Sequence, residues 1–180
     1  MTTNIFVKRN LEITAIITVI IASVMLIAIG STNSILAQQE KQQKSFNANL
    51  SGSSEVPPTS INATGNAEFQ VATNMKELTY SLNVKDLEGI TEAHIHKGKV
   101  SENGPVILTL YKSKSPSNET NTSLTIKETV TSAKLEGPLA GKQLPDLITI
   151  MNNGTTYVNV HTEQNPLGAV RGQILSAAGT

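Results

Sequence analysis

All three histidines of this 180-residue chain lie in two short segments of the sequence. His94 and His96 belong to residues 93–98, and His161 belongs to residues 157–162. In both segments the histidines alternate with apolar residues, as side chains do along a β-strand. Imidazole is the commonest protein ligand of metal ions and suits copper and zinc. The two segments favour a structural role, in which the imidazoles bond to backbone or neighbouring side chains; the alternative is one copper or zinc ion bound by all three.

The strand around His94 has one apolar and one polar side. Ala93 and Ile95 point to the first side, and Glu92, His94 and His96 point to the second. If the apolar side meets the core, the histidines lie on the outer, polar face of the sheet. Glu92 then either orients an imidazole through a hydrogen bond or is an ordinary solvated strand residue.

A short connection, residues 163–167, joins the last two strands as an antiparallel hairpin. Pairing His161 with Ala169 keeps the apolar residues of both strands on one side. Glu92 and the other two histidines join the polar side if their strand lies beside the hairpin. Arg171 there either clamps an anionic group or pairs with a neighbouring amide or loop carbonyl. The predicted polar patch of the hairpin consists of Tyr157, Asn159, His161, Arg171 and Gln173.

Short strand-like runs separated by turn signals account for most of the chain after residue 44. Leu78, Tyr80, Leu82 and Val84 alternate with polar residues and give the clearest half-buried strand. Proline near the start and glycine after the end predict one short helix over residues 144–151. The pattern predicts an all-β fold, an antiparallel β-sandwich or barrel of about 7–9 short strands. The expected strands lie within residues 45–50, 67–71, 78–84, 91–96, 105–111, 124–133, 155–161 and 168–176.

The N-terminus carries a hydrophobic run that stands apart from the strands. Residues 13–30 contain no charged residue, and two basic residues precede them. This predicts a hydrophobic helix within residues 1–30 that is either a signal peptide or a retained membrane anchor. Residues 31–44 are polar and Gln-rich, which is typical of a linker. The domain at residues 45–177 is then exported, either secreted or held at the extracytoplasmic face of the membrane.

Composition narrows the classes of function. The chain has 14 basic and 14 acidic residues and a formal net charge of zero, so no basic surface for nucleic acid is expected. It contains no cysteine, which excludes disulfides and a cysteine nucleophile. The Gly-x-Ser-x-Gly motif of serine hydrolases does not occur either. We therefore expect no catalysis.

Seven short turn and strand motifs follow one another along the domain: LSG (50–52), EVPP (55–58), ATGNA (63–67), AHIHKG (93–98), NGPV (103–106), YVNVHT (157–162) and RGQI (171–174). With these motifs, residues 45–176 resemble the CHRD domain, the module repeated in chordin and found in many bacterial and archaeal exported proteins. One departure is Ala169, which stands where an acidic residue is common and removes a polar partner beside Arg171.

The resemblance implies an all-β extracytoplasmic domain and no reaction, in an exported archaeal or bacterial single-domain member of the family. The signalling partner of chordin does not carry over to a lone domain. A weaker likeness is to Cu/Zn superoxide dismutase, a β-sandwich with a His-x-His strand, and it covers only His94, His96 and His161. Three histidines are too few for a dinuclear site but suffice for one ion.

Two functions follow from these patterns. The first is a binding or structural module whose partner is an unknown extracellular protein or surface ligand, with residues 13–30 in the membrane if they are uncleaved. The second is a mononuclear copper- or zinc-binding domain that uses His94, His96 and His161. The second requires the three imidazoles to approach within roughly 4 Å of one another, since each bond to the ion is roughly 2 Å long.

Overall fold

The computed structural model of the chain describes residues 43–114 and 122–177. Within these residues nine strands form one sheet, and all paired strands run antiparallel. Eight of them follow the order β5-β4-β7-β8-β1-β2-β3-β6, and the ninth, β9, pairs with β1. The elements are β1 (Ser45–Ser51), β2 (Thr64–Val71), β3 (Leu78–Lys85), β4 (Ile90–Lys97), β5 (Val106–Lys112), β6 (Ser123–Val130), α2 (Leu144–Asn152), β7 (Thr156–Thr162), β8 (Val170–Gln173) and β9 (Leu175–Ser176). The predicted all-β fold with one short helix is confirmed.

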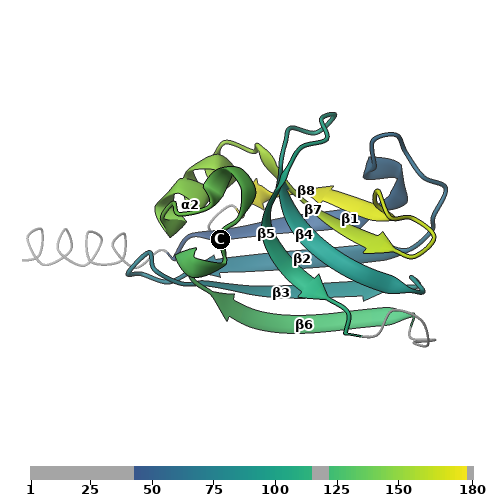
Figure 1. The fold of residues 1–180 in the computed structure, drawn as a ribbon, viewed down its shortest axis with the longest axis horizontal. Helices are drawn as coiled ribbons and strands as arrows, with labels where there is room; N and C mark the ends of the chain where they lie inside the picture. The colour runs from purple at the N-terminus through teal and green to yellow at the C-terminus, as the bar shows by residue number, and fades with distance from the viewer. Residues whose placement is uncertain (1–42, 115–121, 178–180) are drawn as a thin grey trace, which may run out of the picture. The chain divides into compact units, whose positions relative to one another are not determined.

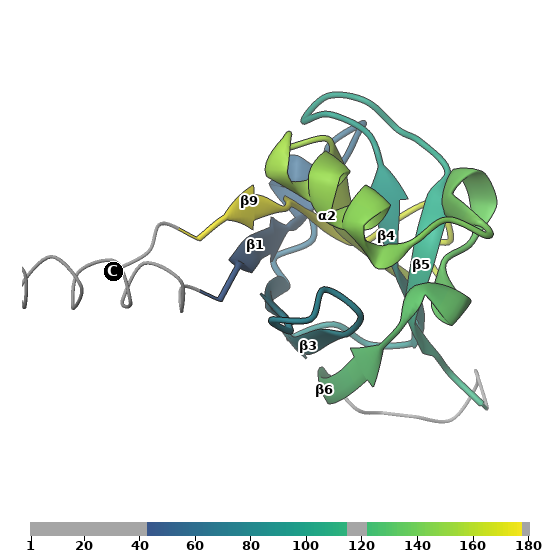
Figure 2. The ribbon, with the colours of Figure 1, turned by 90° about the vertical axis from the view of Figure 1, so that its left-hand side faces the viewer.

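The sheet curls into a half-barrel, and β4 and β5 cross over the strands β1, β2 and β3 (Figures 1 and 2). Apolar side chains such as Phe69, Leu82 and Ile95 fill the interior, each at most 1 % exposed. The Tyr80 hydroxyl donates a hydrogen bond to the Leu110 carbonyl at 2.5 Å and so joins β3 to β5 across this interior. Burial of these apolar side chains supplies the main driving force for folding.

Strict alternation in β3 confirms the clearest of the sequence predictions. Leu78, Tyr80, Leu82 and Val84 are buried, whereas the residues between them are partly exposed. Neighbouring strands repeat this alternation because paired residues share a face of the sheet. The outer side of β1, β2, β3 and β6 is consequently polar, and the inner side faces the core.

Helix α2 covers one end of the half-barrel (Figure 1). Its first turn contains Pro145, and the Gln143 N–H donates to an Asp146 carboxylate oxygen at 2.8 Å, which satisfies a free donor at the helix start. Leu147 and Met151 lie on its buried face and pack into the core. The predicted helix is thus present, with the expected proline near its start.

Two predicted strands differ in extent from the structure. The expected strand at 168–176 is interrupted at Ile174: β8 pairs with β7 and, at Ser51, with β1, whereas β9 pairs with β1 at Phe46 and Asn47. The expected strand at 124–133 ends at Val130, and residues 132–134 form a 3-10 turn. Both differences come from neighbouring segments that the local pattern does not reveal.

The predicted hydrophobic helix within residues 1–30 lies outside the described residues, as does the expected linker except for its last two residues. Within the part of the chain that the structure describes, no helix is both long and apolar enough to cross a membrane.

Candidate metal centre

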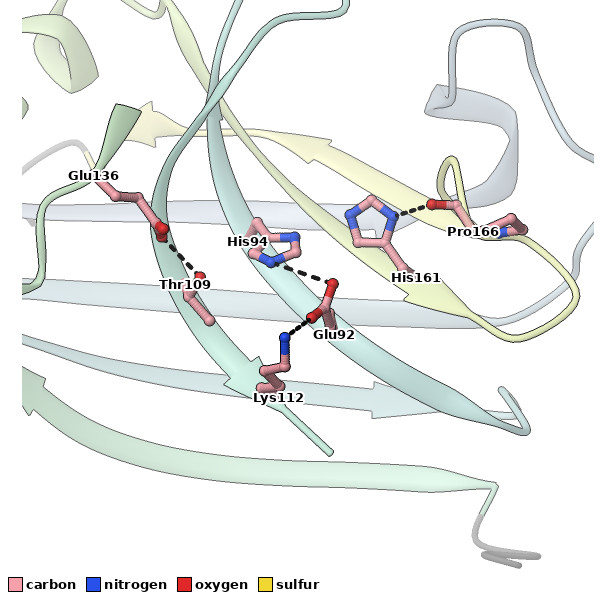
Figure 3. Close-up of polar contacts among 7 residues, drawn as sticks. All are labelled: Glu92, His94, Thr109, Lys112, Glu136, His161 and Pro166. Atoms are coloured by element: carbon pink, nitrogen blue, oxygen red, sulfur yellow. Dashed lines mark hydrogen bonds and ion pairs between the residues drawn. The ribbon is translucent and has the colours of Figure 1, made fainter. Parts of the chain in front are cut away.

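Pairing of β4 with β7 brings the two histidine segments together. His94 lies opposite Asn159, and His96 and His161 occupy neighbouring positions on the same face. The ring centres lie 5.0 Å apart for His94 and His161, 5.6 Å for His94 and His96, and 5.8 Å for His96 and His161. Figure 3 shows His94 and His161 on the same side of these two strands. Strands far apart in the sequence therefore assemble the three imidazoles into one cluster.

Loop carbonyls hold two of the imidazoles in place. His96 Nδ1 donates to the Gly104 carbonyl at 2.9 Å, and His161 Nδ1 donates to the Pro166 carbonyl at 3.1 Å. Because a carbonyl oxygen only accepts hydrogen bonds, Nδ1 carries the hydrogen in both rings and Nε2 keeps its lone pair. Metal-binding histidines are commonly fixed in this way by a hydrogen bond from the other ring nitrogen.

A carboxylate lies beside the third imidazole (Figure 3). His94 Nε2 is 3.8 Å from one carboxylate oxygen of Glu92, whose other oxygen is 2.8 Å from Lys112 Nζ. The hydrogen bond from Lys112 lowers the pKa of Glu92 and keeps this carboxyl ionised near neutral pH. On the adjacent strand, the Thr109 hydroxyl donates to Glu136 at 2.7 Å. With Nε2 facing Glu92, His94 has its Nδ1 free for the cluster.

Three buried imidazole nitrogens have no hydrogen-bond partner among the described residues: Nδ1 of His94 and Nε2 of His96 and His161. Each of the three residues is only 9 % exposed. Burial lowers the pKa of all three imidazoles, to about 4 for His96, so the rings are neutral near pH 7. An unpaired buried polar atom costs roughly 1–3 kcal/mol. One ion bound to all three lone pairs would remove that cost.

The spacing of the cluster suits a single ion after a small adjustment. One nitrogen from each of His94, His96 and His161 lies within 4.8 Å of the other two. A tetrahedral zinc ion with Zn–N bonds of roughly 2.0–2.1 Å needs its ligand atoms roughly 3.3–3.5 Å apart. The nitrogens thus lie somewhat farther apart than the roughly 4 Å expected from the sequence, and a bound ion would have to draw them together.

The hairpin has the predicted register, but its polar side chains are buried. Tyr157 pairs with Gln173 and Asn159 pairs with Arg171. Tyr157 and Arg171 are each 1 % exposed and Asn159 is 2 % exposed. These residues lie on the polar side of the sheet, as expected, but loops cover that side, so it is a second, polar layer and not a surface exposed to solvent.

The loop at residues 98–104 explains this burial. Arg171 donates to the carbonyls of Lys99 at 2.8 Å and Glu102 at 2.9 Å, and to Asn103 Oδ1 at 3.0 Å. A buried guanidinium needs such acceptors because its donors leave water on folding. Of the two predicted roles of Arg171, the structure has the contact with loop carbonyls.

A family model of the CHRD domain matches residues 46–174. The chain belongs to the CHRD domain family. A search of curated proteins finds no match. The family match spans the sheet from β1 to β8 and contains all three histidines, so the cluster lies within the CHRD domain itself. The archaeal or bacterial single-domain origin stays a prediction.

Glu55, in the EVPP motif of this CHRD domain, is a buried acid that the sequence pattern did not predict. Glu55 is 5 % exposed, and Asn159 Nδ2 donates to its Oε2 at 3.4 Å. Burial raises the pKa of Glu55 to about 7, although the Arg171 charge and the Asn159 hydrogen bond oppose this rise. A glutamate that precedes Val-Pro-Pro in a turn is expected to be exposed to solvent. Glu55 is buried because this turn folds over β7.

Acidification from pH 7 to pH 5 is expected to destabilise the metal-free CHRD domain. Each imidazole has a pKa lowered from 6.5, so the unfolded chain takes up protons that the folded chain refuses, and stability falls as pH falls. Glu55 has the opposite effect, since its pKa is raised from 4.5 to about 7 and the folded state keeps its proton. The shifts of His96 and Glu55 are similar in size and opposite in effect, so the lowered pKa values of His94 and His161 decide the net loss of stability. Urea unfolding with a chelator, at a series of pH values, measures the slope.

Two variants separate the contribution of Glu55 to the pH dependence of stability from that of the imidazoles. Glu55→Gln is expected to steepen the loss of stability between pH 7 and pH 5, and His96→Gln is expected to flatten it. A wild-type free energy of unfolding that rises on acidification over this range contradicts the assignment of neutral, buried imidazoles.

Proposed function

We propose that this CHRD domain is an exported binding module that holds one copper or zinc ion on His94, His96 and His161. The observation that carries the proposal is a cluster of three histidines, each with one ring nitrogen within 4.8 Å of the others and each with a buried ring nitrogen that has no partner among the described residues. Two of the rings are oriented by loop carbonyls and the third lies beside a carboxylate, as ligand imidazoles commonly are.

The donor set favours copper and zinc. Three neutral imidazoles suit both ions, and nitrogen sites generally bind copper(II) more tightly than other divalent first-row ions. Magnesium and calcium prefer carboxylate and carbonyl oxygens, which the three ligands do not supply. Three protein ligands also leave a fourth position of the ion for an outside molecule.

In this proposal the domain binds the ion and catalyses no reaction. Nε2 of His96 and His161 is the nitrogen that could act as a base, and among the described residues it has no hydroxyl partner to activate. We place the domain outside the cytoplasm, because the basic residues before the hydrophobic run at 13–30 favour export of everything that follows.

A second candidate function is a surface module with no ion, in which the same histidines only support the fold. The carbonyl hydrogen bonds of His96 and His161 are consistent with it. It differs from the first because it gives the three free lone pairs no partner.

Metal analysis of the purified full-length chain is the test. We expect about one copper or zinc ion per chain after loading and dialysis, and a melting temperature that rises with free metal. Binding to the folded state alone adds about 2.7 kcal/mol when the free ion is at 100 times its Kd. His94→Ala and His161→Ala should each weaken binding by more than about 100-fold, beyond the loss typical for a residue that only orients a ligand.

Asn66→Ala, on the polar outer side of β2, is the matched control and should leave binding unchanged. Absence of bound ion together with a melting temperature that copper and zinc do not move would contradict the metal site. Equal destabilisation of the histidine variants with and without metal would then favour the surface module.

A further inference from the structure

A cavity of about 500 Å³ adjoins the histidine cluster. His96, Asn159 and Glu55 line it, together with Gly104 and Pro166, whose carbonyls hold two of the imidazoles. Its volume falls within the range of small-molecule sites. The cavity and the cluster thus share a wall.

Two residues that line the cavity each have a buried oxygen without a hydrogen-bond partner within the described part of the chain: Oε1 of Glu55 and Oδ1 of Asn159. Both residues are more than nine-tenths buried, at 5 % and 2 % exposed. A Cβ atom on Gly168 would lie 2.8 Å from each of these oxygens, so a glycine at this position keeps bulk away from them. Buried acceptors of this kind normally have a donor, and none of the described residues supplies one here.

In the pairing of β4 with β7, Asn159 occupies a position among the three histidines. It pairs directly with His94 across the two strands and is two residues from His161 on its own strand, on the same face. It also shares the cavity wall with His96. Asn159 is therefore a neighbour of the proposed ligands in the strand pairing and in the lining of the cavity.

We propose that a small neutral molecule with both a lone pair and an N–H or O–H group binds in this cavity. Its lone pair completes the coordination of the ion, and its hydrogen is accepted by Asn159 Oδ1 and Glu55 Oε1. This inference rests on the proposed copper or zinc site and names what occupies the fourth position of the ion.

The chemistry of the wall selects the class of ligand. Asn159 Oδ1 is an acceptor, and so is Glu55 Oε1 when the carboxyl is ionised, so a ligand without a donor would leave them unpaired at a cost. Water, ammonia and azoles such as imidazole carry a lone pair and a donor on one small frame. An anion such as azide carries the lone pair but brings no hydrogen, and it faces the Glu55 carboxyl.

Methylated imidazoles test the inference because the position of the methyl group decides whether an N–H remains. The copper(II)-loaded full-length chain is titrated with imidazole, 4-methylimidazole and 1-methylimidazole, and the added nitrogen ligand is followed by electron paramagnetic resonance and visible absorption. The first two keep the N–H, whereas 1-methylimidazole has the same mass as 4-methylimidazole but no donor. We expect the N–H azoles to bind about tenfold more tightly, as one hydrogen bond to a buried acceptor provides.

Removing the acceptors should abolish this preference. In Glu55→Met and Asn159→Leu, which approximate the shapes of the side chains, we expect the ratio of affinities for 4-methylimidazole and 1-methylimidazole to fall toward one. Copper content and the unfolding curve are measured for each variant, so that loss of ion or of fold is seen directly.

Equal binding of 1-methylimidazole and 4-methylimidazole to the wild-type chain overturns the inference, whatever the variants do. A preference that survives in both folded variants overturns it as well. If copper binds with no azole preference, the metal site stands and only the cavity ligand fails. A chain that binds no copper contradicts the proposed function itself, and the inference with it.

Discussion

Replacing Arg171 with methionine is expected to lower the free energy of unfolding of the domain by about 3–5 kcal/mol, the loss typical when one partner of a buried charged network is removed. Arg171 is 1 % exposed, among the most deeply buried side chains of the described residues. Its guanidinium donates to the carbonyls of Lys99 and Glu102 and to the side chain of Asn103. Methionine fills similar space but removes the donor to the Glu102 carbonyl and to Asn103 Oδ1, whereas the Lys99 carbonyl keeps the Glu102 N–H as a partner.

The aromatic contact of Arg171 adds to this effect. The guanidinium carbon lies 3.4 Å from the centre of the Tyr157 ring, and that ring also stacks with His96 at a ring separation of 5.0 Å and an angle of 8°. A cation over an aromatic face is stabilising, most of all when both are removed from water. Arg171 therefore links the loop at 98–104 to Tyr157 and, through that ring, to His96.

Urea unfolding of the metal-free chain measures the effect. Arg171→Lys keeps the charge but loses the planar fork of donors, so we expect it to destabilise clearly, though less than methionine does. Lys127→Met, on the exposed side of β6, is the control and should change little. A destabilisation of Arg171→Met no larger than that of Lys127→Met would show that the loop does not depend on Arg171.

Strand alternation predicted the pairing of Asn159 with Arg171, because the period of a strand is two residues and opposed side chains share a face. The same argument placed the histidines on the polar side of their strands. It could not predict that β4 lies beside β7, since no short turn connects them and the pairing is non-local. The cluster of His94 and His161 depends on that pairing.

Burial of the polar face was beyond the sequence pattern for a different reason. Alternation distinguishes the side of a strand that faces the core from the other side, but it does not report what covers the other side. Here the loop at 98–104 and the turn with Glu55 cover it, and their contacts with Arg171 and Asn159 join residues far apart in the chain. A buried acid in a proline-rich turn therefore went unpredicted.

Gly104→Ala is expected to destabilise the domain by about 3 kcal/mol, at the upper end of typical overpacking, and to weaken copper binding at least about tenfold. A Cβ atom at this position would collide with the carbonyl oxygen of Lys97. Backbone must move to relieve that contact. The Gly104 carbonyl holds His96 at 2.9 Å and its N–H donates to the Tyr157 hydroxyl at 3.1 Å, so the movement also displaces a proposed ligand.

Alanine substitutions at two other glycines distinguish the loss of stability from the loss of copper binding. Gly141 has φ +75°, and a Cβ atom there would meet no described atom within 4 Å, so Gly141→Ala measures left-handed strain alone, about 1–2 kcal/mol. At Gly172 a Cβ atom would collide with the Asn49 carbonyl, so Gly172→Ala should destabilise the sheet without moving the carbonyl that holds His96. Chemical unfolding and copper titration of all three variants give the comparison. If Gly104→Ala and Gly172→Ala weaken copper binding equally, the loss reflects general destabilisation; only a selective loss in Gly104→Ala assigns the orientation of His96 to its loop.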